Sequence, residues 1–293
     1  MMIGVTGASG HLGRSVAEGL LGVLPPDQVV LVTREPHKLA DLAARGAVVR
    51  QGDFDKPAGL AAAFAGIDRL LLISTDALGA RVPGHLAAVG AAADAGVAHV
   101  VYTSVGNPSD DNPAVVAPEH RATEDALRAS GVHWTFLRNG IYADLQLAPG
   151  VGAVATGTLL ANSGSGGSAY VTRADCAAAA VAVLTGEGHE NKIYDITGPK
   201  AVDAHGLAAI YSEISGRPVT AVLVDDAAWI AAMVEHAGMA EPIAAAYASF
   251  GAAQRAGYAA VATDTVLRLT GRPATSLREF VGANRDAFVP TQI

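Results

Sequence analysis

Cysteine is almost absent from this chain. Cys176 is the single cysteine among 293 residues, so an internal disulfide is excluded. Small secreted proteins usually depend on disulfides, whereas thiols stay reduced in the cytoplasm. The first residues also lack the charged segment and the cleavage site of a signal peptide. We therefore expect a cytoplasmic location.

Long apolar runs, a basic surface and metal-ligand clusters are missing too. The longest apolar run, from Cys176 to Leu184, has nine residues, whereas a membrane-spanning helix needs about 20. With 20 basic and 28 acidic residues the net charge is −8, which argues against nucleic-acid binding. The nine histidines are scattered and show no metal-ligand spacing. The composition therefore predicts no membrane, nucleic-acid or metal partner.

Three glycines spaced three residues apart follow the first apolar run, Ile3–Thr6. An amphipathic helical pattern comes next, and this order is typical of a dinucleotide phosphate site. Gly7 can form the tight turn, Gly10 lets the backbone approach a pyrophosphate, and Gly13 lets the helix pack on the sheet. The free N–H groups of the helix start would bind the phosphates. The predicted phosphate-binding residues are Gly7, Ser9, Gly10, His11, Leu12 and Gly13.

The second apolar run, Val29–Val32, ends at Thr33-Arg34. NAD enzymes usually have an acidic residue at this point to bind the ribose 2′-hydroxyl, whereas arginine suits a 2′-phosphate. Lys38 could add positive charge, and an ordinary solvated arginine is the alternative interpretation. The sequence therefore predicts NADPH as the cofactor, with NADH as the alternative.

Short apolar runs alternate with helical patterns up to about residue 145. This alternation predicts an α/β fold, a Rossmann-like doubly wound parallel sheet covered on both faces. Ligands of such sheets bind at the carboxyl ends of the strands. The expected strands are 3–6, 29–32, 47–49, 70–74, 97–103 and 134–137, with helices near 11–23, 36–45, 57–65, 80–95 and 118–130.

Helical patterns dominate after residue 145. We predict an NADP-binding domain over 1–145 and a smaller, mainly helical substrate-binding lobe over 146–293, with the cleft between them. The strand-like segment 192–197 is expected to return to the main sheet, and 219–224 is a second one. The expected helices are near 173–186, 203–215, 226–237 and 240–256.

Two residues after the third run have two interpretations. Asp53 could bond the adenine amino group while Phe54 packs on the adenine ring. Alternatively, this segment caps the helix that begins near Pro57.

A series of motifs in order makes the chain resemble the NmrA-like group of atypical short-chain dehydrogenases, and within it the bacterial NAD(P)H:quinone oxidoreductases of type 2. The resemblance covers nearly the full length. The matching motifs are Gly7–Gly13, Val32-Thr33-Arg34-Glu35-Pro36, Leu70–Ser74, Tyr102-Thr103-Ser104, Glu119-His120, Leu137–Tyr142 and Thr172-Arg173-Ala174-Asp175.

The resemblance implies roles for residues at the strand ends. Ser74 and Thr75 would line the nicotinamide ribose, and Ser104 and Asn139 are further cofactor-binding candidates. Substrate-binding candidates are Gly140, Ile141, Tyr142 and Arg173, of which Tyr142 is also a catalytic candidate. Arg173 would lie at the cleft between the lobes, although Thr172–Asp175 is also a good helix start. A homodimer is the oligomeric state that we consider beside a monomer.

The Tyr-x-x-x-Lys pair of typical short-chain dehydrogenases is missing, because no tyrosine lies between Tyr102 and Tyr142. His120 is near the expected place and ordinarily has a pKa near neutrality, so it is a catalytic candidate. A solvated histidine at a helix start is the alternative.

Without a tyrosine acid, reduction of an ordinary ketone is difficult because an alkoxide develops. A quinone gives a hydroquinone anion with a phenol-like pKa of about 10, so orientation of the reactants suffices. The sequence therefore predicts an NADPH-dependent oxidoreductase that transfers a hydride to a quinone. The alternatives are an enzyme that modifies an aromatic polyketide or another secondary-metabolite quinone, and a non-catalytic NADP-binding sensor or regulator.

Overall fold

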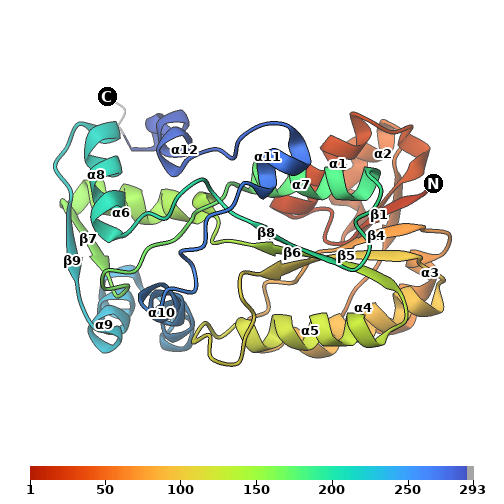
Figure 1. Ribbon diagram of the computed structural model, residues 1–293, viewed down its shortest axis with the longest axis horizontal. Helices are drawn as coiled ribbons and strands as arrows, with labels where there is room; N and C mark the ends of the chain where they lie inside the picture. The colour runs from red at the N-terminus through yellow and green to blue at the C-terminus, as the bar shows by residue number, and fades with distance from the viewer. Residues whose placement is uncertain (289–293) are drawn as a thin grey trace.

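A seven-stranded parallel sheet organises the molecule. The computed structural model describes residues 1–288, and the strand order is β3-β2-β1-β4-β5-β6-β8. Figure 1 labels β1, β4, β5, β6 and β8 of this sheet. The predicted doubly wound sheet is therefore confirmed. The strands are β1 (Ile3–Val5), β2 (Val29–Thr33), β3 (Val48–Gln51), β4 (Arg69–Leu72), β5 (His99–Val105), β6 (His133–Asn139) and β8 (Lys192–Ile196).

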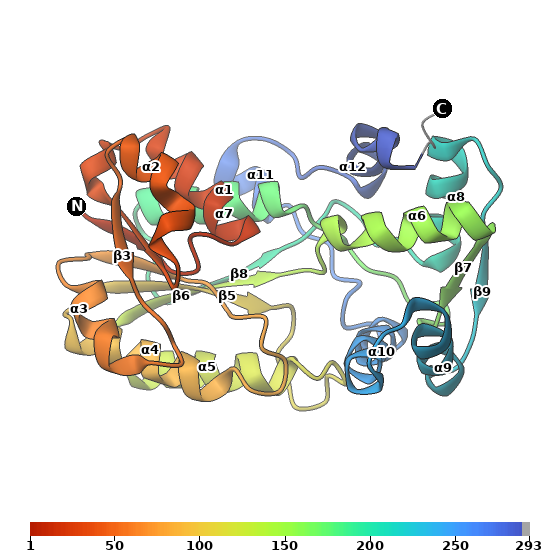
Figure 2. The same ribbon diagram turned by 180° about the vertical axis from the view of Figure 1, so that it is seen from behind.

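Helices cover both faces of the sheet, as Figures 1 and 2 show. One face carries α1 (His11–Leu21), α2 (Ala40–Ala44), α7 (Arg173–Thr185) and α11 (Thr265–Thr270). The other carries α3 (Leu60–Phe64), α4 (Val82–Asp94) and α5 (Ala117–Ala129). Within residues 1–288 no helix has the length and apolarity needed to cross a membrane.

The alternation of strand side chains explains the two layers. Successive residues of a strand point to opposite faces, so each buried strand supplies both hydrophobic cores. Leu31, Leu71 and Val101 pack under α1 and α7, whereas Val30, Leu70 and Val100 pack against the opposite layer. The near-continuous apolar runs of the sequence are therefore the signature of strands that are buried on both sides.

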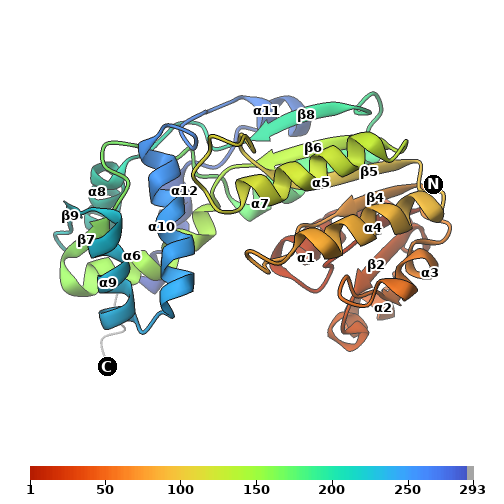
Figure 3. The same ribbon diagram turned by 90° about the horizontal axis from the view of Figure 1, so that it is seen from below.

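A second lobe lies beyond the carboxyl ends of the strands, toward which the arrows of Figure 3 point. Its core includes the stacked rings of Tyr211 and Phe288, whose centroids are 5.6 Å apart. Two of its strands form a separate parallel pair. Its elements are α6 (Leu147–Thr156), β7 (Thr158–Ala161), α8 (Ala204–Ser215), β9 (Thr220–Leu223), α9 (Asp226–Ala237), α10 (Glu241–Arg255) and α12 (Leu277–Ala283).

The chain crosses between the two lobes repeatedly. After residue 145 it forms α6 and β7, returns to pack α7 on α1 and to pair β8 with β6, and then leaves again for α8. Later, α11 packs on α7 and α12 on α8. The predicted return of 192–197 to the main sheet is therefore confirmed by β8. The division at residue 145 does not hold for α7 and α11, because both pack on the α1 side of the main sheet.

The crossing segments are joined to one another by backbone hydrogen bonds, and we call this region the waist. Gly140 N–H donates to Ile196 at 2.9 Å, Gly198 N–H to Ala169 at 3.1 Å, and Ala169 N–H to Ala259 at 2.9 Å. A Cβ atom on Gly198 would lie 1.9 Å from the carbonyl oxygen of Tyr170. Only glycine therefore permits this close approach.

Candidate functional site

The glycine loop (Gly7–Gly13) joins β1 to α1 at the carboxyl edge of the sheet. Gly7 has a φ of +59°, which L side chains rarely adopt, and its carbonyl oxygen accepts the N–H of Gly10 at 2.9 Å. Gly10 precedes α1, and no side chain of the described residues caps this helix. The first N–H groups of α1 are therefore free to bind an anion such as a pyrophosphate.

Gly13 allows α1 to lie against the loop. A Cβ atom at Gly13 would be 2.3 Å from the carbonyl oxygen of Gly7 and 2.8 Å from Cα of Ala8. Both neighbours are backbone atoms, so no side-chain movement could relieve the clash. The Ser9 hydroxyl lies 2.8 Å from that of Thr33 and ties the loop to the end of β2. Leu12 is buried in the core and offers only its backbone N–H, whereas the His11 side chain is exposed.

Arg34 and Lys38 differ in their surroundings. Arg34 is exposed at the end of β2, and its guanidinium has no ion pair within residues 1–288. Lys38 instead pairs with Glu35 at 2.6 Å, so its charge is already partly neutralised. Arg34 is therefore the cation that remains available for a 2′-phosphate.

Asp53 and Phe54 form a turn after β3. Asp53 Oδ1 accepts the N–H of Asp55 at 3.1 Å, but Lys56 precedes the short helix at Pro57, and no described side chain caps it. The helix-capping interpretation is therefore wrong. The Phe54 ring packs on the core and meets the edge of the His85 ring, with the centroids 6.2 Å apart. A contact of Asp53 with adenine stays a prediction.

The segment that leaves β4, Ile73–Thr75, packs against the glycine loop, and we call it the post-β4 segment. Cβ of Ile73 is 3.7 Å from the place that a Cβ on Gly7 would occupy. Ile73 N–H donates to Thr6 Oγ1 and Ser74 N–H to Thr103 Oγ1, both at 2.9 Å. The structure thus places Ile73 against the predicted pyrophosphate loop. Ser74 and Thr75, predicted beside the nicotinamide ribose, follow Ile73 directly in the chain.

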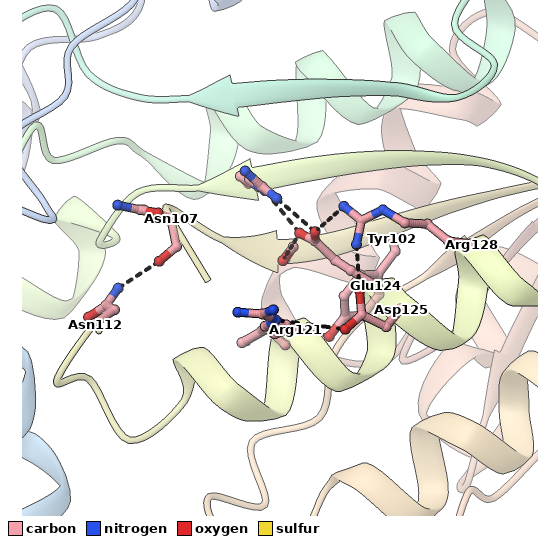
Figure 4. Close-up of polar contacts among 10 residues, drawn as sticks. Tyr102, Asn107, Asn112, Arg121, Glu124, Asp125 and Arg128 are labelled. Carbon is pink, nitrogen blue, oxygen red and sulfur yellow. Dashed lines mark hydrogen bonds and ion pairs between the residues drawn. The ribbon is translucent and has the colours of Figure 1, made fainter. Parts of the chain in front are cut away.

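Glu124 lies buried on α5, one turn after His120. Its carboxylate accepts hydrogen bonds from Ser104 Oγ (2.7 Å), from two nitrogens of Arg138 (2.9 and 2.7 Å) and from Arg128 (2.9 Å; Figure 4). Ser104 is therefore directed toward α5 with its proton engaged by Glu124. No contact at this position supports its predicted cofactor role.

His120 is 5% exposed and hydrogen-bonded through both ring nitrogens. Arg81 Nη1 lies 3.2 Å from Nε2, and the Tyr102 hydroxyl lies 2.8 Å from Nδ1. Because arginine only donates, Nε2 accepts from Arg81 and the Nδ1–H donates to Tyr102. Burial, together with the charge of Arg81, lowers the pKa of His120 well below its usual value.

Two expectations for His120 are therefore wrong. It has no near-neutral pKa, and it is not a solvated residue at a helix start. A neutral imidazole whose protonated form is disfavoured by burial cannot serve as a ready proton donor. The sequence could not show this, because Arg81 is 39 positions away and only the packing of α4 against α5 brings it to His120.

Asn139, Tyr142 and Arg173 come together at the carboxyl end of β6. Asn139 Nδ2 donates to the Tyr142 hydroxyl at 3.2 Å, and the Arg173 guanidinium carbon lies 5.0 Å from the Tyr142 ring centre. Burial raises the pKa of Tyr142 above its usual value, so it remains a neutral phenol. The Thr172 hydroxyl accepts the N–H of Asp175 at 3.0 Å, which confirms that Arg173 is also at a capped helix start.

A cavity of about 250 Å³ lies beside this group. Asn139, Gly140 and Ile141 line it, whereas Tyr142 and Arg173 do not. The opposite wall comes from the second lobe, including Phe250, Tyr258 and Val261. Sequence reasoning missed these three residues. Phe250 lies on α10, and a helical pattern does not show which side chains face a cleft, whereas Tyr258 and Val261 lie in the segment after α10, for which the sequence predicted no element.

Comparison with known proteins assigns this architecture to a family. A family model described as NAD(P)H-binding matches residues 7–187. The chain belongs to this NAD(P)H-binding family. The match begins at the glycine loop and ends just after α7, so it includes the helix that packs on α1.

Curated relatives in the NAD(P)H-binding family match nearly the whole chain. Quinone oxidoreductase 2 of Escherichia coli (strain K12) is 38% identical over 96% of this chain and 97% of its own length. A Streptomyces griseus (4-alkanoyl-5-oxo-2,5-dihydrofuran-3-yl)methyl phosphate reductase is 36% identical over 99% and 100%. An NmrA-like family domain-containing oxidoreductase of Aspergillus flavus is 30% identical over 73% and 72%. The predicted NmrA-like resemblance is thereby confirmed.

Solved structures of the family share the fold. The crystal structure of an Escherichia coli NADPH-dependent quinone oxidoreductase complexed with NADPH has a TM-score of 0.93 at 38% identity, covering 97% of this chain and 99% of that one. Citrobacter sp. triphenylmethane reductase complexed with NADP(H) has a TM-score of 0.90 at 37% identity, covering 96% and 99%. An NAD(P)H cofactor is thus a property of the family to which this chain belongs.

Proposed function

We propose that this protein is an NADPH-dependent oxidoreductase that transfers a hydride to a quinone-type acceptor. The proposal rests on two features that occur together. The site for an NADP-type phosphate is open, and the tyrosine that donates a proton in typical short-chain dehydrogenases is missing. The glycine loop offers N–H groups, and Arg34 offers a cation that has no ion pair within residues 1–288. His120, on the helix expected to carry the usual acid pair, is buried and hydrogen-bonded through both ring nitrogens.

The residues fit NADPH where they can be tested. The uncapped start of α1 suits the pyrophosphate and Arg34 suits the 2′-phosphate. The bound cofactor supplies the hydride. The protein's residues orient the acceptor: Asn139, Gly140 and Ile141 form one wall of the cavity, and Phe250 and Tyr258 offer flat apolar surface on the other.

The chemistry of the acceptor accounts for the absence of an acid. A quinone that gains a hydride becomes a hydroquinone anion, which takes its proton from water because its phenol-like pKa is about 10. The compounds named for the relatives, a quinone, an unsaturated oxo-dihydrofuran and triphenylmethane dyes, all have conjugated π systems. Such acceptors delocalise the incoming electrons, so orientation can supply much of the rate.

A second candidate is the modification of a secondary metabolite. The Streptomyces griseus relative, which is named for reducing an alkanoyl-oxo-dihydrofuranyl methyl phosphate, favours it. A conjugated enone would then replace the quinone at the same cavity. A non-catalytic NADP sensor is the third candidate, and it predicts cofactor binding without turnover.

Location and assembly remain predictions. The single cysteine supports a cytoplasmic site of action, and size-exclusion chromatography with light scattering would test the predicted homodimer.

Turnover assays distinguish these candidates. Purified protein is mixed with NADPH and a panel of one-, two- and three-ring quinones, an unsaturated lactone, and a simple aromatic ketone as the control. We expect steady NADPH oxidation with quinones and none above background with the ketone. Cofactor binding without any turnover would favour the sensor, and a preference for the lactone would favour the second candidate.

A further inference from the structure

The post-β4 segment is held by side chains rather than by the sheet. The strand β4 ends at Leu72, and the next three backbone N–H groups each donate to a different side chain. Thr6 accepts from Ile73, Thr103 accepts from Ser74, and His85 Nε2 accepts the Thr75 N–H at 3.1 Å. These acceptors come from the end of β1, from β5 and from α4 respectively.

The hydrogen bonds of His85 determine its protonation state. A backbone amide only donates, so Nε2 must be the unprotonated nitrogen, and the proton lies on Nδ1. Thr123 Oγ1 lies 3.0 Å from Nδ1 and can accept this proton, because its own hydroxyl donates to the carbonyl oxygen of Glu119 at 3.0 Å. Only a neutral His85 satisfies this arrangement.

The hydrogen bond from the Thr75 N–H to His85 Nε2, which we call the anchor, lies at a place that matters for the cofactor. The strands β1 and β4 are neighbours from which the chain proceeds to opposite sides of the sheet, and ligands of doubly wound sheets bind at such a switch point. The post-β4 segment forms the wall beside the glycine loop, because Ile73 packs against Gly7. Displacement of Thr75 would change the shape of this wall.

We propose that His85 is a positioning residue for NADP(H): by accepting the Thr75 N–H it fixes the post-β4 segment in the conformation that receives the nicotinamide half of the cofactor. This inference rests on the proposed function. His85 is fully buried and acts through Thr75, without itself touching the ligand.

Of the three acceptors, only His85 can gain a proton. Burial and then the nearby charge of Arg81 lower the pKa of His85 to about 4. Arg81 pairs with Glu119 at 3.2 Å, and Tyr102 and His120 complete the polar surroundings. Protonation would turn Nε2 of His85 into a hydrogen-bond donor that faces the Thr75 N–H, which is also a donor. The anchor is therefore intact well above pH 4 and is lost as the pH falls through that value.

Binding of NADP⁺, which needs no turnover, tests this proposal by calorimetry. His85→Leu removes the acceptor and leaves the partly buried Thr75 N–H unpaired, so we expect the Kd to rise roughly tenfold. His85→Gln places an amide oxygen near the position of Nε2, so we expect a Kd within about threefold of wild type, because most of the lost hydrogen bond is restored.

His99→Leu is the matched control. His99 is also a buried histidine with a pKa lowered to about 4 by burial, and it bonds Thr135 at 2.7 Å. It lies at the opposite end of the sheet, where β5 begins. We expect His99→Leu to lose stability while its NADP⁺ affinity stays unchanged.

The pH dependence gives a second readout. The ratio of the Kd values of wild type and His85→Gln should rise as the pH is lowered from 6 toward 4, because only the wild type loses its anchor. Protonation of the phosphates of NADP⁺ changes both Kd values by the same factor, so it cancels in their ratio. This comparison also holds if His85→Leu fails to fold.

The outcomes separate this proposal from the proposed function. An unchanged Kd in His85→Leu, or a flat pH ratio, would overturn the positioning role only. Wild-type protein that binds NADP⁺ but reduces no quinone, enone or lactone would overturn the proposed oxidoreductase function and leave the role of His85 intact.

Discussion

At the scale of single residues, two neighbouring cations show how surroundings decide function. Arg34 and Lys38 carry the same charge and lie close in sequence, yet Glu35 engages only Lys38. Charge-assisted bonds to a phosphate require a cation that is not already paired. The structure therefore separates two residues that the sequence alone treats as one positive patch.

Substitution of these residues tests the choice of cofactor. Arg34→Ser should raise the Kd for NADPH about 10- to 100-fold, because a hydrogen bond between charged groups contributes about 1.5–3 kcal/mol. The Kd for NADH should stay within about twofold. Lys38→Ser is the matched control and should change both values little. Equal losses for NADPH and NADH in Arg34→Ser would remove Arg34 from its assigned role.

Predictions of residue roles from the sequence succeeded where backbone conformation determines which residue is allowed. They failed where the role depends on packing against distant residues. Gly7 and Gly13 could be recognised, since the loop conformation excludes other residues. His120 could not, because its pKa depends on Arg81 and on burial. Ser104 is a similar case, because its partner Glu124 lies on another element. Local motifs report on loops, whereas protonation and hydrogen bonding depend on distant neighbours.

At the scale of secondary structure, the buried strands were predictable, and so were α8, β9, α9 and α10 of the second lobe, whereas α6, β7 and α12 were not. The sequence predicts no helix over 147–156, because Pro149, Gly150 and Gly152 weaken helix propensity. In the structure Gly150 lies where α6 packs on Tyr211 and Phe288, and a Cβ there would come within 2.6 Å of both rings. The glycine that suggests a loop is therefore a packing requirement.

Two glycine substitutions in helices should have opposite effects. Gly13→Ala places a methyl group against the Gly7 carbonyl, so we expect the free energy of unfolding to fall by about 1–3 kcal/mol and NADPH binding to weaken. Gly90→Ala, within α4, meets no atom within 4 Å and should raise the free energy of unfolding by about 0.5–1 kcal/mol. Urea titration and cofactor binding measure both. Stabilisation by Gly13→Ala would contradict the close contact of α1 with the loop.

At the scale of the whole molecule, buried neutral histidines should make the protein sensitive to acid. Burial lowers the pKa values of His85 and His99 to about 4, whereas in the unfolded chain they lie near 6.5. Between these values the unfolded state binds more protons. The free energy of unfolding should therefore fall as the pH is lowered from about 6.5 to 4, by up to about 1.4 kcal/mol per pH unit for each histidine.

Urea denaturation at several pH values measures this slope. His85→Gln and His99→Leu should each make it shallower, and together they should nearly remove the contribution of these two residues. A wild-type stability that does not change between pH 7 and 5 would contradict neutral burial of both histidines.

The waist has a mechanical consequence. Because several segments cross between the lobes and are joined there by backbone hydrogen bonds, a swinging motion of the second lobe would have to shear all of them together. Acceptors of different size should therefore be accommodated by movements of the side chains that line the cavity, not by a movement of the whole lobe. Cutting the chain at any of the crossings would leave each fragment without some of the segments that complete its hydrophobic core. Neither lobe should therefore fold or be transferable as an independent domain.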